Sequence, residues 1–193
     1  MNAEIDISGV VLKTERLILR EFKEDDLDDF YEYAKVDGVG QMAGWNPHEN
    51  KEKSMMILKD FIKEKKTFAL QYNNKVIGSL GIEKDNHLTE LTDLIGRELG
   101  FVLSKDYWGQ GIMKEAVDKV IDYCFYTLDL DYLSCGHYLE NNQSRRVQEK
   151  CGFKRIKKVI FTTRMGIKKE GYLSIIFNPK NNIDISTYFK EQI

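Results

Sequence analysis

Residues 98–116 read Glu98-Leu-Gly-Phe-Val-Leu-Ser-Lys-Asp-Tyr-Trp-Gly-Gln-Gly-Ile-Met-Lys-Glu-Ala116, and this stretch decides the fold. Its first part alternates, with Leu99, Phe101 and Leu103 on one side, as in a half-buried strand. From Ile112 onward the apolar residues recur at helical spacing and form one apolar face. The stretch therefore predicts a strand, a turn and an amphipathic helix.

Two glycines, Gly109 and Gly111, lie in the turn between the predicted strand and helix. The first N–H groups of a helix have no partner within it and lie at the positive end of its dipole. Because glycine lets a large anion approach the backbone, this turn is typical of a phosphate or pyrophosphate site. A plain turn before a helix is the alternative, and this fragment alone leaves it open. The turn is neither a P-loop nor a dinucleotide fingerprint, since Lys114 stands where the fingerprint has its third glycine.

The composition is that of an ordinary globular chain, with 193 residues of which 42% are hydrophobic and 31% charged. This length predicts one domain with a substantial core. A formal net charge of -2 argues against a nucleic-acid partner and against a polybasic membrane surface. The acidic N-terminus resembles no signal peptide and no apolar run reaches membrane-spanning length, so we expect a cytoplasmic protein. Three cysteines without metal-ligand spacing predict buried, reduced thiols and no metal site.

The remaining segments predict one mixed α/β domain over residues 10–179, with a loose leader over 1–9 and a polar tail over 180–193. Periodicity and turn residues predict strands over 16–20, 68–72, 76–82, 95–103, 132–138, 153–163 and 172–177. Helices are predicted from a cap at 25–26 to 34, over 51–65, from 112 to about 128, and from 140–144 to the C′ residue Gly152. Asn141 or Asn142 is the expected N-cap of the last helix, and Gly136 predicts a bulge.

The loop over residues 38–47 contains three glycines, one proline and Trp45. An aromatic side chain in such a loop is a candidate for lining a ligand pocket, so Trp45 is a candidate substrate-binding residue. Packing of Trp45 on the core is the alternative, and the sequence leaves it open.

Three segments form a set with a fixed order. They are Leu12-Lys-Thr-Glu-Arg-Leu-Ile-Leu-Arg20, the part of 98–116 quoted above, and Asn141-Asn-Gln-Ser-Arg-Arg-Val-Gln-Glu-Lys-Cys-Gly-Phe153. This set resembles the GNAT superfamily of N-acetyltransferases, within the branch that includes the ribosomal-protein alanine acetyltransferases. The resemblance implies a mixed, mostly antiparallel sheet that is splayed between its fourth and fifth strands, with helices on both faces.

The same resemblance implies a cosubstrate, acetyl-CoA, in the opening of the sheet. Its acetyl group would pass directly to a primary amine, of a protein N-terminus or a small molecule, in a ternary complex of a monomer or homodimer. The positions that match the family's pyrophosphate turn are Gly109, Gln110, Gly111, Ile112, Met113 and Lys114. The strand positions that would hold the pantetheine arm by their main chain are Phe101, Val102 and Leu103. Asn141 and Ser144 match the family's polar contacts to the pantetheine and the sulfur.

Two positions depart from the family pattern. Met113 stands where the pattern has Gly or Ala, which only backbone contacts would tolerate without cost. Gln148 stands where many members have a tyrosine as general acid, and glutamine has no proton to titrate. In the ribosomal-type branch the serine that matches Ser144 is the usual substitute, so Ser144 is expected to stabilise or protonate the leaving thiolate.

The reaction also needs a base that accepts the proton of the amine. We take Glu98 as this base, because it lies on the predicted central strand just before the cofactor-binding segment; Glu83 and His137 are alternatives. The alternative is that Glu98 has no catalytic role and is either a solvent-exposed charge or the ion-pair partner of Arg97. We expect the loop around Trp45 and the last hairpin to select the acceptor, whose identity stays open. A non-catalytic acyl-CoA-binding module is the alternative function, and a domain for another nucleotide is a third.

Overall fold

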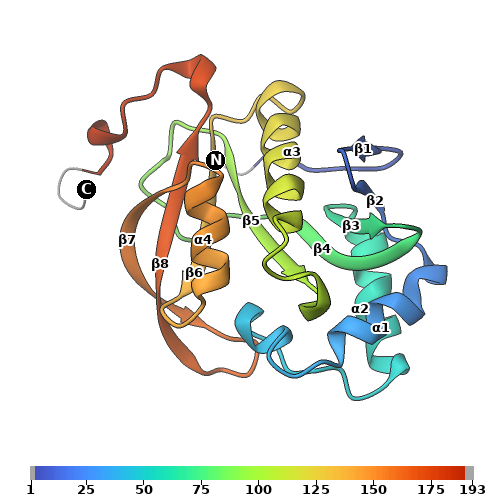
Figure 1. Ribbon diagram of the computed structural model, residues 1–193. Helices are drawn as coiled ribbons and strands as arrows, with labels where there is room; N and C mark the ends of the chain where they lie inside the picture. The colour runs from blue at the N-terminus through green and yellow to red at the C-terminus, as the bar shows by residue number, and fades with distance from the viewer. Residues whose placement is uncertain (1–2, 190–193) are drawn as a thin grey trace.

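The computed structural model describes residues 3–189, which form one eight-stranded sheet with helices on both faces (Figure 1). The strand order is β1-β2-β3-β4-β5-β6-β8-β7. The strands are β1 Leu12–Lys13, β2 Ile18–Glu21, β3 Thr67–Tyr72, β4 Lys75–Glu83, β5 Gly96–Leu103, β6 Tyr132–Tyr138, β7 Lys154–Thr162 and β8 Lys168–Phe177. The helices are α1 Leu27–Ala34, α2 Lys51–Glu64, α3 Ile112–Tyr126 and α4 Asn142–Lys150. The predicted strands and helices are all present, and the mixed, mostly antiparallel architecture is confirmed.

The sheet opens between β5 and β6, its one parallel pair of strands. These strands pair only over Gly96–Glu98 and Tyr132–Ser134, although β5 runs on to Leu103 and β6 to Tyr138. The other neighbours in the sheet pair antiparallel. The opening lies between β5 and β6. These are the fourth and fifth strands when the count starts at β2, because the short β1 is an additional strand at the edge. It leaves the ends of both strands free to border a ligand site (Figure 1).

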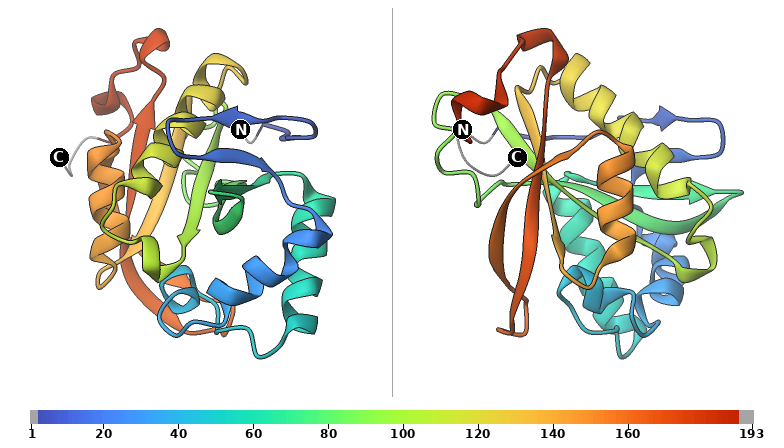
Figure 2. Two further views of the ribbon diagram at one scale, coloured as in Figure 1. Left: turned by 45° about the vertical axis from the view of Figure 1, so that its right-hand side comes forward. Right: turned by 60° about the vertical axis from the view of Figure 1, so that its left-hand side comes forward.

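The two faces of the sheet carry separate cores, as the alternation of side chains along each strand requires. On one face α3 packs with Phe68 and Leu80, and α4 lies beside α3 (Figure 2). On the other face α1 and α2 pack with Ala69 and Val76. The predicted apolar stripe of α3 is buried: Ile112, Ala116, Val117, Val120, Ile121, Cys124 and Phe125. The strand–turn–helix unit therefore stands at the centre of the larger core.

Two expectations from the sequence are wrong. The leader is not loose where the structure describes it, since Ile7 is completely buried and its N–H donates to the Lys65 carbonyl over 2.9 Å. Gly136 marks no bulge, because the β6–β8 register runs through it without a shift. Its missing side chain makes room for the Phe161 ring, which a Cβ at Gly136 would approach to 2.6 Å. Neighbours across the sheet, rather than local turn chemistry, explain this glycine.

The tail also contributes to the fold up to residue 189. It contains two single 3-10 turns, at Pro179–Asn181 and Ile185–Thr187, and Tyr188 packs against a third, smaller apolar cluster that includes Leu91, Leu173 and Ile175. The last residues, 190–193, lie outside the described part of the chain. All three cysteines are buried and free, as predicted. Within residues 3–189, no helix combines the length and the apolar character needed to span a membrane.

Candidate functional site

The opening between β5 and β6 holds a cleft of about 260 Å³. Its walls are the end of β5, the turn before α3 and one side of α4. Ten of the residues predicted to hold the cofactor line this cleft: Phe101, Val102, Leu103, Gly109, Gly111, Ile112, Met113, Lys114, Asn141 and Ser144. The structure thus gathers three segments that are distant in sequence around one opening.

Gln110 is the predicted cofactor residue that does not line the cleft. Its exposed side chain turns back and donates from Nε2 to the Asp106 carbonyl over 2.8 Å. Its own carbonyl accepts a hydrogen bond from Arg16 Nη1 over 3.0 Å. Gln110 therefore helps to shape the turn, and its side chain is not placed for a ligand.

The glycine turn presents backbone N–H groups to the cleft. Gly109 and Gly111 both have φ of +76°, a conformation that residues with side chains rarely adopt. Gly111 caps α3 without any side-chain hydrogen bond, so the first N–H groups of the helix are left for a ligand. The Met113 side chain is buried in the core, which explains how methionine is accommodated where the family pattern has Gly or Ala. The turn can bind an anionic phosphate by its backbone.

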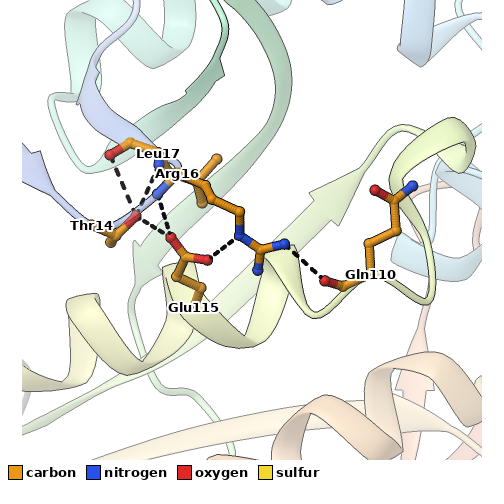
Figure 3. Close-up of polar contacts among 5 residues, drawn as sticks. All are labelled: Thr14, Arg16, Leu17, Gln110 and Glu115. Carbon is orange, nitrogen blue, oxygen red and sulfur yellow. Dashed lines mark hydrogen bonds and ion pairs between the residues drawn. The ribbon is translucent and has the colours of Figure 1, made fainter.

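The turn is held from behind by residues of the N-terminal segment (Figure 3). Arg16 donates from Nε to Glu115 Oε2 over 2.6 Å and from Nη1 to the Gln110 carbonyl, so it ties the turn to the first part of α3. The backbone N–H of Arg16 and the Thr14 hydroxyl both donate to Glu115 Oε1. Partial burial opposes ionisation of Glu115, but these hydrogen bonds hold its pKa below the ordinary value. We call Thr14, Arg16 and Glu115 the turn clamp.

A second, larger cavity of about 990 Å³ lies beside the middle of β5, among α2, β4 and the loops before α2 and after β7. A third cavity of about 200 Å³, which we call the passage, shares Glu98, Gly100 and Phe101 with the lining of the larger cavity and Phe101, Asn141 and Ser144 with the lining of the cleft. A thioester in the cleft and an amine in the larger cavity would therefore meet at this passage.

Glu98 stands where the passage enters the larger cavity. Its half-buried carboxylate forms no hydrogen bond or ion pair with any residue in the described range. Burial, reinforced by the Asp85 and Glu83 carboxylates, raises the pKa of Glu98 to about 8. Glu83 is its direct partner across the β4–β5 pair, so like charges share one face of the sheet. A carboxylate with this pKa is a much stronger base than an ordinary one.

The alternatives to Glu98 are engaged elsewhere. Glu83 forms an ion pair with Lys66 at 2.7 Å. His137 is buried, which lowers its pKa, and its Nδ1 lies 3.1 Å from Gln148 Oε1. Arg97 is 5% exposed and makes no ion pair with Glu98, so the structural interpretation of Glu98 as an exposed or Arg97-paired charge is wrong.

Gln148 fixes the hydroxyl of Ser144 at the other end of the passage. Its Nε2 donates to Ser144 Oγ and to the Gly136 carbonyl, both over 3.1 Å. Its Oε1 must then accept from His137, so His137 carries its hydrogen on Nδ1. Because Ser144 Oγ already accepts a hydrogen bond, its own hydrogen is free to point to a ligand in the cleft. At the position of the family's tyrosine, Gln148 thus donates a hydrogen bond to Ser144.

Trp45 satisfies both interpretations of the sequence. It lines the larger cavity and also packs against the core of α1 and α2. Its ring lies 5.0 Å from that of His48, whose pKa is lowered to about 4 by burial and by the nearby cations Lys53 and Arg164. Arg164, on the last hairpin, lines the same cavity as expected.

The turn clamp and the donor role of Gln148 are the main features that the sequence did not predict. Arg16 lies in a segment whose resemblance to the family was visible, yet its partner Glu115 is 99 residues away. Gln148 was visible only as the residue in place of a tyrosine. Arg16 acts on a residue far away in the sequence, whereas Gln148 acts on Ser144 within α4, with its amide fixed by His137 and Gly136 of β6.

The comparisons with known proteins agree with this geometry. Residues 16–154 match the family model described as "Acetyltransferase (GNAT) domain". An uncharacterized N-acetyltransferase, YoaA of Bacillus subtilis, is 27% identical over 155 residues, covering 75% of this chain and 83% of that protein.

Solved structures share the fold. A GNAT-family acetyltransferase from Bacillus anthracis has a TM-score of 0.77 at 22% identity, covering 88% of this chain and 99% of the other. A putative ribosomal-protein-serine acetyltransferase from Vibrio cholerae has a TM-score of 0.72 at 21% identity, covering 86% and 97%. The microcin C7 self-immunity acetyltransferase MccE, solved with acetyl-CoA and AMP, has a TM-score of 0.72 at 14% identity, covering 85% and 93%. The chain therefore belongs to the GNAT family, and it is an acetyl-CoA-dependent N-acetyltransferase.

Proposed function

We propose that the amine acceptor enters through the larger cavity and meets acetyl-CoA at the passage between Glu98 and Ser144. One observation carries this proposal: a base and a hydroxyl donor line the same short passage between two cavities of different chemistry. The acceptor is the primary amine of a protein N-terminus or of a small molecule. The predictions of a cytoplasmic monomer or homodimer, without nucleic acid or membrane, belong to the same proposal.

The cleft fits acetyl-CoA in three respects. The uncapped start of α3 suits a diphosphate, and the end of β5, which no longer pairs with β6, offers backbone groups to the amide-bearing arm. Among the residues that the structure describes, no carboxylate side chain lines the cleft to repel an anion. When bound, acetyl-CoA supplies an acyl group activated as a thioester. We assign Phe101, Val102 and Leu103 to the arm and the turn at 109–114 to the diphosphate.

Glu98 accepts the proton that the amine loses as its nitrogen bonds to the acyl carbon. A base works best when its pKa is close to the operating pH, and burial beside Glu83 and Asp85 brings the pKa of Glu98 to about 8. Ser144 donates a hydrogen bond to the sulfur, which leaves as a thiolate with the electron pair of the broken carbon–sulfur bond, while Gln148 holds the serine oxygen in place. Positioning of the two reactants by the two cavities supplies much of the rate enhancement.

The test begins with calorimetric titration of acetyl-CoA, beside ATP and NAD, into the wild type, Gly111→Trp and Gly166→Trp. Both glycines have φ of +76°, but Gly166 lies in the turn between β7 and β8, so the pair separates backbone strain from loss of the site. We expect micromolar binding of acetyl-CoA alone, weakened at least about 100-fold in Gly111→Trp, because several hydrogen bonds to phosphate are lost, and retained in Gly166→Trp.

Thiol release with N-terminal peptides and polyamines then identifies the acceptor class. Preference for ATP or NAD would contradict the cofactor assignment. Binding of acetyl-CoA without thiol release for any acceptor would favour the non-catalytic acyl-CoA-binding module.

A further inference from the structure

The outer part of the cofactor cleft is strongly basic. Lys114, Arg146 and Lys150 line the cleft, and no aspartate or glutamate within residues 3–189 does, in a chain with 31 acidic and 29 basic residues. Lys114 is neutralised by an ion pair with Asp118, one turn further along α3. Arg146 and Lys150 form no hydrogen bond or ion pair with any residue of the described range 3–189. Two positive charges therefore face this cleft without a counter-charge.

The two cations lie on one side of α4, four residues apart, together with Gln143 and Val147 of the same lining. The neighbouring Arg145 does not line the cleft and pairs with Glu149 at 3.0 Å. Two adjacent arginines of one helix thus differ: one is balanced within the protein and the other is not. The arginine without a counter-charge, Arg146, is the one on the side of α4 that lines the cleft.

The direction of α4 places these cations away from the reaction end. The helix begins beside the passage with Asn141 and Ser144, and Lys150 lies about 9 Å further along its axis. The end of α4 meets the first turn of α3, where Cys151 Sγ lies 3.8 Å from the Lys114 carbonyl. The unpaired cations therefore flank the glycine turn on the side away from the thioester.

We propose that Arg146 and Lys150 bind the phosphate monoester on the ribose of coenzyme A, so that the enzyme distinguishes acetyl-CoA from its 3′-dephospho form. This inference rests on the proposed acetyl-CoA site and extends it. The glycine turn serves the diphosphate through backbone N–H groups. The ribose phosphate carries close to two further negative charges, and an arginine and a lysine one turn apart match this charge. The same cations on the diphosphate are the competing explanation.

Two ligands that differ only in the phosphate monoester separate these explanations. Coenzyme A and 3′-dephospho-coenzyme A are titrated calorimetrically into the wild type, into Arg146→Gln/Lys150→Gln and into the control Arg145→Gln. We expect the wild type to bind coenzyme A about tenfold more tightly than the dephospho form, because hydrogen bonds between charged groups are lost with the phosphate. In the double variant this ratio falls towards one, since only coenzyme A binding weakens, and the control keeps the wild-type ratio.

Raising the salt concentration should reduce the ratio in the wild type, because exposed charges are screened. An unchanged ratio in the double variant would overturn the proposal. Equal weakening of both ligands would also overturn it, because the cations would then contact the diphosphate. Failure of both ligands to bind the wild type would overturn the acetyl-CoA site itself, and this proposal with it. All exchanged side chains are at the surface, and thermal melting confirms that each variant is folded.

Discussion

The cleft beside α4 and the larger cavity beyond Glu98 lie on either side of one passage, yet their linings differ in kind. The cleft is lined by the glycine turn, the start of α3, the free end of β5 and one side of α4, and the charged side chains among its described lining residues are all cations. The larger cavity is built of side chains of both signs: Glu49, Glu64, Glu83 and Glu98 with Lys53, Lys66, Lys84 and Arg164.

We infer that this difference reflects the ligand that each cavity binds. Backbone N–H groups of a local turn suit a diphosphate. An amine acceptor differs between enzymes, and side chains from separate elements must match it. The passage joins the two cavities at Glu98 and Ser144, and the following predictions test whether each side works as its lining suggests.

The largest effect is expected at Glu98. Since its pKa is raised to about 8, the ionised base is scarce below that pH, and kcat/KM should rise about tenfold per pH unit up to a midpoint near 8. Glu98→Gln should lower kcat/KM about 100-fold or more and abolish this rise, while the Kd of acetyl-CoA is unchanged. The measurement is a pH profile of thiol release at acceptor concentrations below saturation.

Glu83→Gln is the matched control for that profile. Removing the neighbouring negative charge should move the midpoint to lower pH and leave a rising limb. Loss of the limb in Glu83→Gln, with its retention in Glu98→Gln, would assign the base to Glu83 instead.

A smaller effect is expected at the hydroxyl donor. Ser144→Ala should lower kcat about 10- to 100-fold, since a donor to the leaving sulfur is lost. Gln148→Leu should cost less, and the double variant should be no slower than Ser144→Ala, because Gln148 acts through Ser144. Gln143→Leu, on the same helix and in the same cleft, is the control.

The buried Gln148 also supports the fold, so its replacement should lower the melting temperature by leaving His137 and the Gly136 carbonyl without partners. Rates are therefore compared well below the melting transition. Additive losses in the double variant would show that Gln148 does not work through Ser144.

The smallest effect is expected at the turn clamp. Arg16→Gln and Glu115→Gln should each raise the KM for acetyl-CoA about three- to tenfold at unchanged kcat, because the turn loses a support that does not touch the reacting atoms (Figure 3). Lys75→Gln removes an exposed ion pair with Glu32, at 2.7 Å, and should change neither constant. A fall in kcat alone would contradict a positioning role.

The sequence predicted the strand–turn–helix unit well for a physical reason. Residues 98–116 form one continuous strand–turn–helix, so period, glycines and capping potential are all local. The cap of α4 is local too: Asn141 accepts from the Ser144 N–H over 3.0 Å, as one of two predicted caps. The two wrong expectations have a non-local cause. Ile7 is held by the Lys65 carbonyl, and the space beside Gly136 is filled by the Phe161 ring, and both partners are distant in sequence.

By itself, then, the sequence determined the class of fold, the course of the chain through the glycine turn, and the family to which those motifs belong. These features depend on side-chain periodicity and backbone conformation within a few residues. Tertiary packing places Glu83 and Asp85 around Glu98, fixes the Gln148 amide against His137 and Gly136 of β6, and brings Arg16 to the turn. The pKa of Glu98, the fixed amide of Gln148 and the support of the glycine turn all depend on burial and on distances between separate segments. They therefore arise only once these segments have packed together.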